Sequence, residues 1–141
     1  MTIRLLAPGD EALLRRAAPL ADHAPDLARC RALLAEPTFV AVVALAEDGA
    51  PVGFAYGHVL HRPDADSLLL YSIDTDEAHR RHGAARGMIE ALKALCVARG
   101  YDEMWVLTDA ANAPAMALYP ALGGVREAGD IEVMWVFPTP A

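Results

Sequence analysis

The spacing of apolar residues along the chain predicts four helices. The first carries an apolar stripe over residues 13–18, with Asp10 before it as an N-cap and Pro19 to end or kink it. The second covers residues 26–35, and the fourth covers residues 112–122 and ends at a pair of glycines. The third follows residue 87 and stops at Gly100. Its apolar face consists of Met88, Ile89, Leu92, Leu95 and Cys96.

Apolar runs of strand length alternate with these helices. They cover residues 3–6, 39–46, 52–60, 68–75, 104–107 and 133–137. The run at 39–46 is almost entirely apolar, as in a central strand covered on both faces, and we interpret 104–107 as a second buried strand. Asp48-Gly49 predicts a tight turn, so the strand at 52–60 returns antiparallel. Trp105 and Trp135 fall on strand patterns and are interpreted as core residues.

The order of these elements is strand, two helices, three strands, helix, strand, helix, strand. This order predicts an α/β fold with one mixed sheet and about four helices. No internal repeat, linker or low-complexity segment interrupts it. Residues 1–141 are therefore expected to form a single domain.

Composition narrows the class of protein. Hydrophobic residues make up 55% of the 141 positions, enough for a substantial core, and no apolar run is long enough to cross a bilayer. No signal-peptide pattern is present, because Pro8 and Gly9 interrupt the first residues. Cys30 and Cys96 fall in helical apolar stripes, which predicts buried thiols. A cytoplasmic protein without disulfides or membrane association is therefore expected.

One basic segment stands out against a formal net charge of −7. The acidic balance argues against nucleic acid as a partner, because phosphate neutralisation needs a broad basic face. Residues 80–87, Arg-Arg-His-Gly-Ala-Ala-Arg-Gly, lie between the strand at 68–75 and the third helix. The first N–H groups of a helix have no partner within it, and the helix dipole is positive there. The segment therefore predicts a site for a phosphate-bearing ligand.

Two motifs resemble those of the GNAT acetyltransferases. The first is the family's acetyl-coenzyme A loop: Arg or Gln, two variable residues, Gly, one variable residue, then Gly or Ala. In the second, an Asn opens a helix and an Ala-x-x-x-Tyr run is followed by Gly. The first motif is matched by Arg80, Gly83 and Ala85, and the second by Asn112, Ala115 and Tyr119.

A closer likeness, from residue 26 onward, is to the type I aminoglycoside 3-N-acetyltransferases. It is carried by the run at 34–39, by the entry to the arginine segment at 79–81, and by residues 115–119 followed by Gly and an Arg126-Glu127 pair. The resemblance implies a single GNAT domain. In that fold, mostly antiparallel N-terminal strands precede a parallel pair that splays apart, here the strands at 68–75 and 104–108.

The resemblance also implies how acetyl-coenzyme A would bind. Backbone N–H groups from Arg81 to Arg86 would meet the pyrophosphate. The pantetheine arm would lie in the splayed gap, hydrogen-bonded to the backbone near Ile73 and Thr75. The expected binding residues are Ile73, Thr75, Arg80, Arg81, His82, Gly83, Ala84, Ala85, Arg86, Asn112 and Tyr119, with no metal.

Direct acetyl transfer needs a neutral amine and a proton for the leaving thiolate. The resemblance places the acid at Tyr119. Ser72 stands where the resembling enzymes carry Asp or Glu, so the base must lie elsewhere. Asp109 is the first candidate and Asp74 the second, acting directly, through a water, or instead by binding a substrate ammonium. His23, in the loop expected over the acceptor site, is interpreted as a surface histidine without a role in the reaction; the alternative is that it deprotonates the amine.

These features predict acetyl transfer to a primary amine on a small cationic acceptor, of which an aminoglycoside is an example. The loop carboxylates available to such an acceptor are Asp64, Asp66, Asp109, Glu127 and Asp130. The alternative acceptor is a protein or peptide amine. The alternative function is a non-catalytic acyl-coenzyme A sensor, which Ser72 favours. The family often dimerises, so a homodimer is allowed, with residues 133–137 in an interface or in the core.

Overall fold

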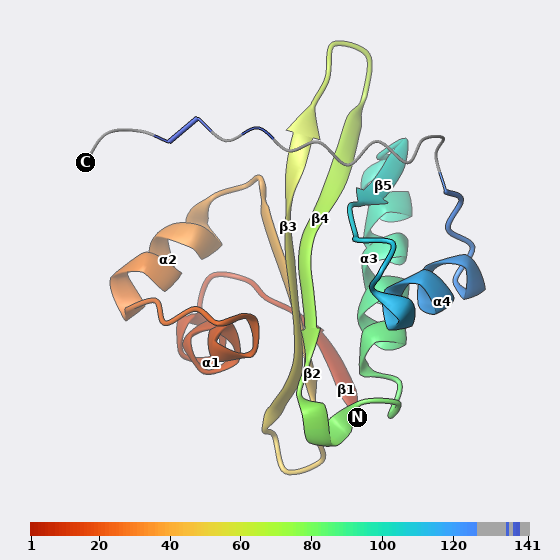
Figure 1. Ribbon diagram of the computed structural model, residues 1–141. Helices are drawn as coiled ribbons and strands as arrows, with labels where there is room; N and C mark the ends of the chain where they lie inside the picture. The colour runs from red at the N-terminus through yellow and green to blue at the C-terminus, as the bar shows by residue number, and fades with distance from the viewer. Residues whose placement is uncertain (127–134, 136, 139–141) are drawn as a thin grey trace.

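A five-stranded sheet in the order β1-β2-β3-β4-β5 separates two layers of helices in the computed structural model (Figure 1). The structure describes residues 1–126, 135, 137 and 138. The first four strands pair antiparallel, and β4 and β5 pair parallel, which confirms the predicted mixed sheet. The strands are β1 (Thr2–Leu5), β2 (Phe39–Leu45), β3 (Pro51–His61), β4 (Asp66–Thr75) and β5 (Glu103–Val106). Most of the strand expected at 133–137 lies outside the described residues.

The four predicted helices are present and are divided between the two faces of the sheet. On one face lie α1 (Glu11–Ala17), its 3-10 extension η1 (Ala18–Ala21) and α2 (Leu27–Ala35). On the other face lies α3 (Ala84–Arg99), with α4 (Ala113–Ala121) beyond β5 (Figure 1). A short 3-10 turn, η2 (Glu77–His79), leads from β4 into the loop before α3.

Each helical layer buries its own apolar cluster against the sheet. On the α3 side, Met88 and Leu92 are fully buried against Val42, Leu68 and Leu70. The α1–α2 side has a second cluster, made by Leu14, Ala17, Ala18, Cys30, Leu34, Ala41, Val43 and Phe54. A fully buried Leu or Met side chain contributes about 1.5–3 kcal/mol. Both cysteines are free and buried, as predicted.

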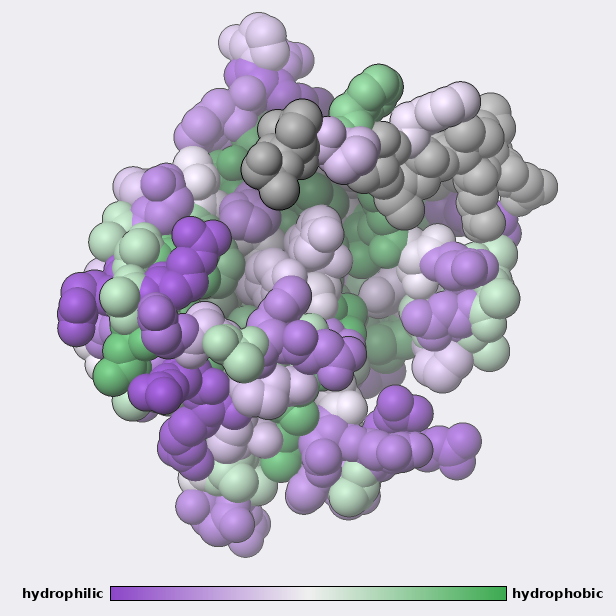
Figure 2. All heavy atoms as spheres, turned by 60° about the vertical axis from the view of Figure 1, so that its left-hand side comes forward, coloured by the Kyte–Doolittle hydropathy of each residue, from purple (hydrophilic) through white to green (hydrophobic). Residues whose placement is uncertain are grey.

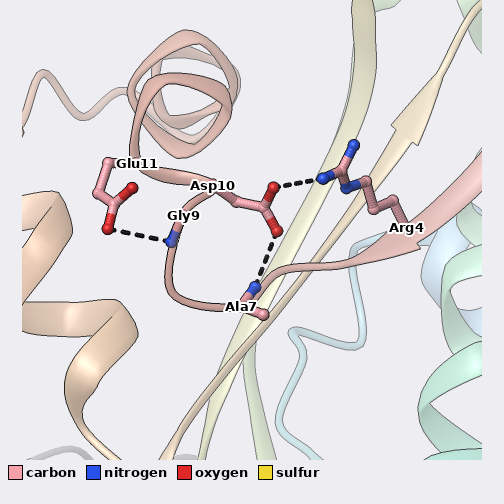
Figure 3. Close-up of polar contacts among 5 residues, drawn as sticks. All are labelled: Arg4, Ala7, Gly9, Asp10 and Glu11. Atoms are coloured by element: carbon pink, nitrogen blue, oxygen red, sulfur yellow. Dashed lines mark hydrogen bonds and ion pairs between the residues drawn. The ribbon is translucent and has the colours of Figure 1, made fainter.

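The start of α1 follows the prediction in position but not in its hydrogen bonds. Asp10 occupies the N-cap position, yet its side chain does not cap the helix. Its φ of −96° and ψ of 22° differ from the extended conformation in which an N-cap carboxylate reaches the helical N–H groups. Instead, Asp10 accepts a hydrogen bond of 2.9 Å from the Ala7 N–H and pairs with Arg4 on β1 (Figure 3). The carboxylate therefore ties the turn to the edge strand.

Strand β5 is less buried than its sequence predicted. Its three apolar residues are half-buried, and Leu107, just beyond its end, is 76% exposed. Among the described residues, β5 pairs only with β4, so its other edge stays open. Trp135, expected in the core, is 80% exposed. An apolar alternation shows that a segment has a face to bury, but it does not identify the surface that covers that face.

A bulge in β4 marks the point where this strand leaves β5. Tyr56 on β3 is opposite Ser72, whereas the next residue, Gly57, is opposite Leu70, so Tyr71 is an extra residue on β4. Bulges bend a strand and increase its twist. Parallel pairing with β5 stops at the Leu70–Val106 pair, directly before the bulge. The bend therefore opens the gap that the splayed pair was expected to have.

Replacement of Gly57 tests how closely the β3 and β4 backbones approach each other at this bulge. A Cβ there would lie 2.1 Å from the Leu69 carbonyl oxygen, a backbone atom that cannot rotate away. We expect Gly57→Ala to lower the free energy of unfolding by roughly 2–3 kcal/mol. Gly53→Ala, on the same strand, is the control, with an expected loss of about 1 kcal/mol. Its Cβ would meet the flexible Met88 Cε at 2.9 Å and the Ala44 Cβ at 3.1 Å, and no backbone atom is among these contacts. Equal losses in urea denaturation would contradict the close approach.

Candidate active site

The gap between β4 and β5 continues into a cavity of about 340 Å³, called here the splay groove. Its walls come from the end of β4, the segment after β5, the first turn of α3, and α4. The lining residues are Tyr71, Ser72, Ile73, Asp74, Thr75, Ala85, Val106, Leu107, Thr108, Asn112, Pro114, Ala115, Leu118 and Tyr119. Segments far apart in the sequence therefore meet around one space.

The β4 edge of the splay groove offers backbone groups to a ligand. The Asp76 N–H points toward β3, where it donates to the Val52 carbonyl at 2.8 Å. Successive N–H groups along a strand point to opposite edges, so those of Ile73 and Thr75 point away from β3 and toward the groove. Past Leu70, no described strand pairs with this edge. The predicted role of Ile73 and Thr75 thus has suitable geometry.

The loop before α3 holds a set of amide groups without partners in the described structure. Gly83 has a φ of +87°, and Arg81 also has a positive φ, of +68°. The N–H groups of Arg81, Gly83, Ala84, Ala85 and Arg86 donate no hydrogen bond to a described residue, and the helical series begins with Gly87 N–H to the Gly83 carbonyl at 2.9 Å. Ala85 also lines the splay groove, so this helix end opens into it. These are the properties of an anion site.

The basic side chains around this loop remain available to an anion. Arg80, Arg81 and Arg86 are exposed, and none forms an ion pair with another described residue. His82 is exposed as well, with its ring centroid 5.9 Å from that of His79. His79 is held by Asp76, with 2.6 Å between Nδ1 and Oδ2. The loop therefore combines free amides with unpaired positive charge.

An acid and a carboxylate face the same groove. Tyr119 is half-buried, and burial raises its pKa above the ordinary value near 10. The negative charge of Asp74 raises this pKa further, because it disfavours the tyrosinate. Ser72 Oγ donates a hydrogen bond of 2.8 Å to Asp74 Oδ2, so these two side chains lie on the same side of β4. Tyr119 therefore stays protonated at neutral pH.

Asn112 lies at the opening of α4, as its motif predicted. Its side-chain oxygen accepts a hydrogen bond of 3.2 Å from the Ala115 N–H, so it caps the helix. It also lines the splay groove together with Tyr119, two turns further along the helix. The capping role and the position at the groove therefore coexist.

The structure does not bring Asp109 into the splay groove. It is exposed, and its Oδ1 accepts a hydrogen bond of 2.8 Å from the Ala111 N–H, in the turn that leads to α4. The other loop carboxylates do not gather there either. Asp66 pairs with His61 at the far end of the β3–β4 hairpin, and Asp64 belongs to the turn of that hairpin. Glu127 and Asp130 lie outside the described residues.

A second cavity, of about 400 Å³, lies on the α1–α2 side of the sheet and is called here the aromatic hollow. Figure 2 brings this side of the molecule forward and shows its surface hollowed beside the helices. The lining residues are Leu14, Ala18, His23, Ala24, Pro25, Arg29, Leu33, Phe39, Phe54, Tyr56 and His58. His23, interpreted from the sequence as a surface residue, has its Nε2 at 3.2 Å from the Tyr56 hydroxyl.

Sequence reasoning missed the strand residues of this hollow, although a signal was present. Phe54, Tyr56 and His58 alternate along β3, so all three point to one face of the sheet. A ring at every second position is more than a simple apolar strand requires. Among the described residues, no cluster of His, Cys, Asp or Glu fits a metal, and no helix is long and apolar enough to span a bilayer.

Comparison with known proteins decides the family. Residues 11–123 match the model of the acetyltransferase (GNAT) family. The chain belongs to the GNAT family. The match contains both sequence motifs and every residue given above as lining the splay groove. In this family the acetyl group is supplied by acetyl-coenzyme A, so the groove and the loop before α3 have the features expected of a site for that molecule.

Individual GNAT relatives differ in the acceptors that their names give. An aminoglycoside acetyltransferase from an uncultured soil metagenomic sample, solved with trehalose, has a TM-score of 0.87 at 21% identity, over 97% of this chain and 96% of that chain. A second soil metagenomic aminoglycoside acetyltransferase has a TM-score of 0.78 at 29% identity, over 96% of this chain and 98% of that one.

The curated relatives include [ribosomal protein bS18]-alanine N-acetyltransferase from Escherichia coli (strain K12). It is 33% identical over 79 residues, which are 56% of this chain and 51% of the relative. This chain thus spans about half the length of the curated relatives it matches. The family model establishes the family, and the acceptor is left to be argued from the site.

Gly83 allows a test of the amide site before α3. A residue other than glycine pays about 1–2 kcal/mol for a left-handed backbone, so Gly83→Ala is expected to distort the loop. We expect the Kd for acetyl-coenzyme A to rise about tenfold, measured by calorimetry. Gly49→Ala is the matched control: it has a φ of +85° with open space around it, in the β2–β3 turn. It should lose similar stability and keep the wild-type Kd. An unchanged Kd in Gly83→Ala would contradict the assignment.

Proposed function

We propose that this chain is an N-acetyltransferase that moves the acetyl group of acetyl-coenzyme A directly to a primary amine of a small acceptor. The observation that carries the proposal is that one cavity joins three features: unpaired amides at the start of α3, a free strand edge on β4, and Tyr119 beside Asp74. A structural cavity alone would not need a protonated phenol and a carboxylate at one end and an anion site at the other.

The donor has a defined place in this proposal. Its diphosphate lies against the amides of residues 81–86, with Arg80, Arg81 and Arg86 around it. The pantetheine arm follows the β4 edge and bonds to the Ile73 and Thr75 backbone. The thioester then lies near Asn112 and Tyr119. Contacts at both ends of the donor would thus orient the thioester, and orientation is itself a large part of catalysis.

Acetyl transfer follows in a balanced step. The lone pair of the neutral amine attacks the thioester carbonyl carbon, a C–N bond forms, and the C–S bond breaks. The leaving sulfur takes the hydroxyl proton of Tyr119, and the proton lost by the amine passes to Asp74, directly or through a water. The products are an amide and free coenzyme A. Asp74 then releases its proton to solvent and Tyr119 takes one up, which restores both groups.

We assign the proton acceptor to Asp74, although Asp109 was the first candidate from the sequence. Asp74 lies in the splay groove and is close enough to Tyr119 to raise the pKa of its hydroxyl. The Asp109 carboxylate instead accepts a hydrogen bond from the Ala111 N–H in the turn before α4. Ser72 does not replace the missing acid but holds the Asp74 carboxylate in place.

A small-molecule acceptor is favoured by the 29% identity, over nearly the full chain, to an aminoglycoside acetyltransferase. A peptide amine is the second candidate, because the curated match is to an enzyme named for a ribosomal-protein alanine. A cytoplasmic location and a homodimer stay predictions.

Replacement of Tyr119 tests the chemical step. With acetyl-coenzyme A and a panel of primary amines, thiol release measures turnover. We expect Tyr119→Phe to lower kcat by roughly 10²-fold or more, because the thiolate then leaves without its acid, while the Kd for acetyl-coenzyme A changes little. Tyr101→Phe is the control, since the Tyr101 hydroxyl bonds to Arg99 and lies outside the groove. Tight binding of acetyl-coenzyme A without amine-dependent thiol release would instead support a sensor.

Replacement of Asp74 tests the base through the pH dependence of kcat. In Asp74→Asn the rising limb should move to higher pH, because free amine must then come from solution. The falling limb should move to lower pH, because the pKa of Tyr119 loses one of the two causes that raise it. Asp109→Asn should leave both limbs in place. If Asp109→Asn moves the rising limb and Asp74→Asn does not, the base is Asp109.

A further inference from the structure

We propose that the aromatic hollow is the acceptor site and that it selects primary monoamines carrying an aromatic ring. The ring would lie in the hollow, and the amine would reach across the β3–β4 edge to Asp74. This inference rests on the proposed function and specifies its substrate class. It is carried by three observations: the position of the hollow, the character of its walls and its charge.

The hollow adjoins the splay groove across one pair of strands. Phe54 and Tyr56, in the wall of the hollow, are the register partners of Asp74 and Ser72, which line the groove. Neighbouring strands lie about 4.8 Å apart. The Tyr56 and Tyr71 rings connect the two cavities, with their centroids at 5.6 Å. A molecule a few atoms long can therefore have its body in the hollow and its amine at Asp74.

The walls of the hollow suit a planar ring. Phe54 and Tyr56 are stacked at 5.5 Å, Phe39 lies 6.0 Å from Tyr56, and His58 lies 5.7 Å from Phe39. Ring centroids at 4.5–7 Å are the distances at which aromatic groups attract one another. The volume of about 400 Å³ lies within the range typical of small-molecule sites. Leu33 and Pro25 add apolar surface on the helical side.

The charge of the hollow argues against a polycation. Among the residues that the structure describes, its lining contains no carboxylate, and the permanent charge of that lining is the positive one of Arg29. An acceptor with several ammonium groups would place some of them near the positive charge of Arg29, and the Asp26 carboxylate beside Arg29 already caps α2 through the Arg29 N–H. A monoamine needs a single carboxylate, and Asp74 is in the required place. An aromatic monoamine therefore fits the described site better than an aminoglycoside does.

The first experiment compares acceptors on the wild-type chain. Phenethylamine, butylamine, the aminoglycoside sisomicin and an alanine-starting peptide are each titrated at saturating acetyl-coenzyme A. We expect kcat/KM for phenethylamine to exceed that of each other amine about tenfold or more, because only its ring is recognised. A higher kcat/KM for butylamine, sisomicin or the peptide overturns the inference but leaves the acetyltransferase function standing.

The second experiment fills the hollow. Ala24 is an exposed loop residue in its wall, so Ala24→Phe should raise KM for phenethylamine about tenfold, leaving KM for butylamine and the Kd for acetyl-coenzyme A unchanged. Ala28→Phe, on an exposed α2 position outside the lining, is the matched control. Equal KM values for phenethylamine in the two variants overturn the inference.

Reversal of charge gives an independent check. Arg29→Glu should lower KM for the diamine putrescine, and Arg31→Glu, exposed on the same helix but outside the lining, should not. An unchanged KM for putrescine in Arg29→Glu would contradict the charge argument. If no amine releases thiol, the proposed function fails. In that case, binding of phenethylamine to the coenzyme A-loaded chain is measured. Binding that Ala24→Phe abolishes supports the inference about the hollow, and absence of binding overturns it.

Discussion

The end of pairing between β4 and β5 is the constraint on which the site depends. A sheet normally satisfies both backbone edges of an inner strand, and unpaired amides in an enclosed space are costly. Here pairing stops at Leu70–Val106, and the extra residue Tyr71 bends β4 away. The free edge is therefore available to a ligand with an extended polar chain. The pantetheine arm of acetyl-coenzyme A has that chemistry, so in the proposal the donor completes the sheet.

The same bend relates the two cavities. The splay groove opens on the β5 side of β4, and the aromatic hollow lies against β3 on the α1–α2 side. Asp74 stands in register with Phe54 at the boundary between them. A donor in one cavity and an acceptor in the other would thus meet at a single carboxylate.

Sequence predicted well what local chemistry decides. The position of Asn112 at the start of α4 and the shared groove of Asn112 and Tyr119 follow from residue type and helical spacing. The sequence-based predictions were wrong where contacts with distant segments determine burial, as with the exposed Trp135 and the half-buried β5. The bulge at Tyr71 was also invisible, because it changes a strand's period without any Gly or Pro to mark it. The sequence ranked Asp109 before Asp74, and only the fold shows that Asp74 lines the splay groove whereas Asp109 accepts a hydrogen bond in the turn before α4.

The coupling between Asp74 and Tyr119 gives the proposed reaction an internal order. While Asp74 is ionised, its charge helps to keep the Tyr119 hydroxyl protonated. When the amine gives its proton to Asp74, that charge disappears and the pKa of Tyr119 falls. In the proposed reaction this change would lower the pKa of Tyr119 as the thiolate leaves, while burial, the larger cause, would continue to raise it. Ser72 suits this role better than a second carboxylate would, because an added negative charge would hold the pKa of Tyr119 high after the first was neutralised.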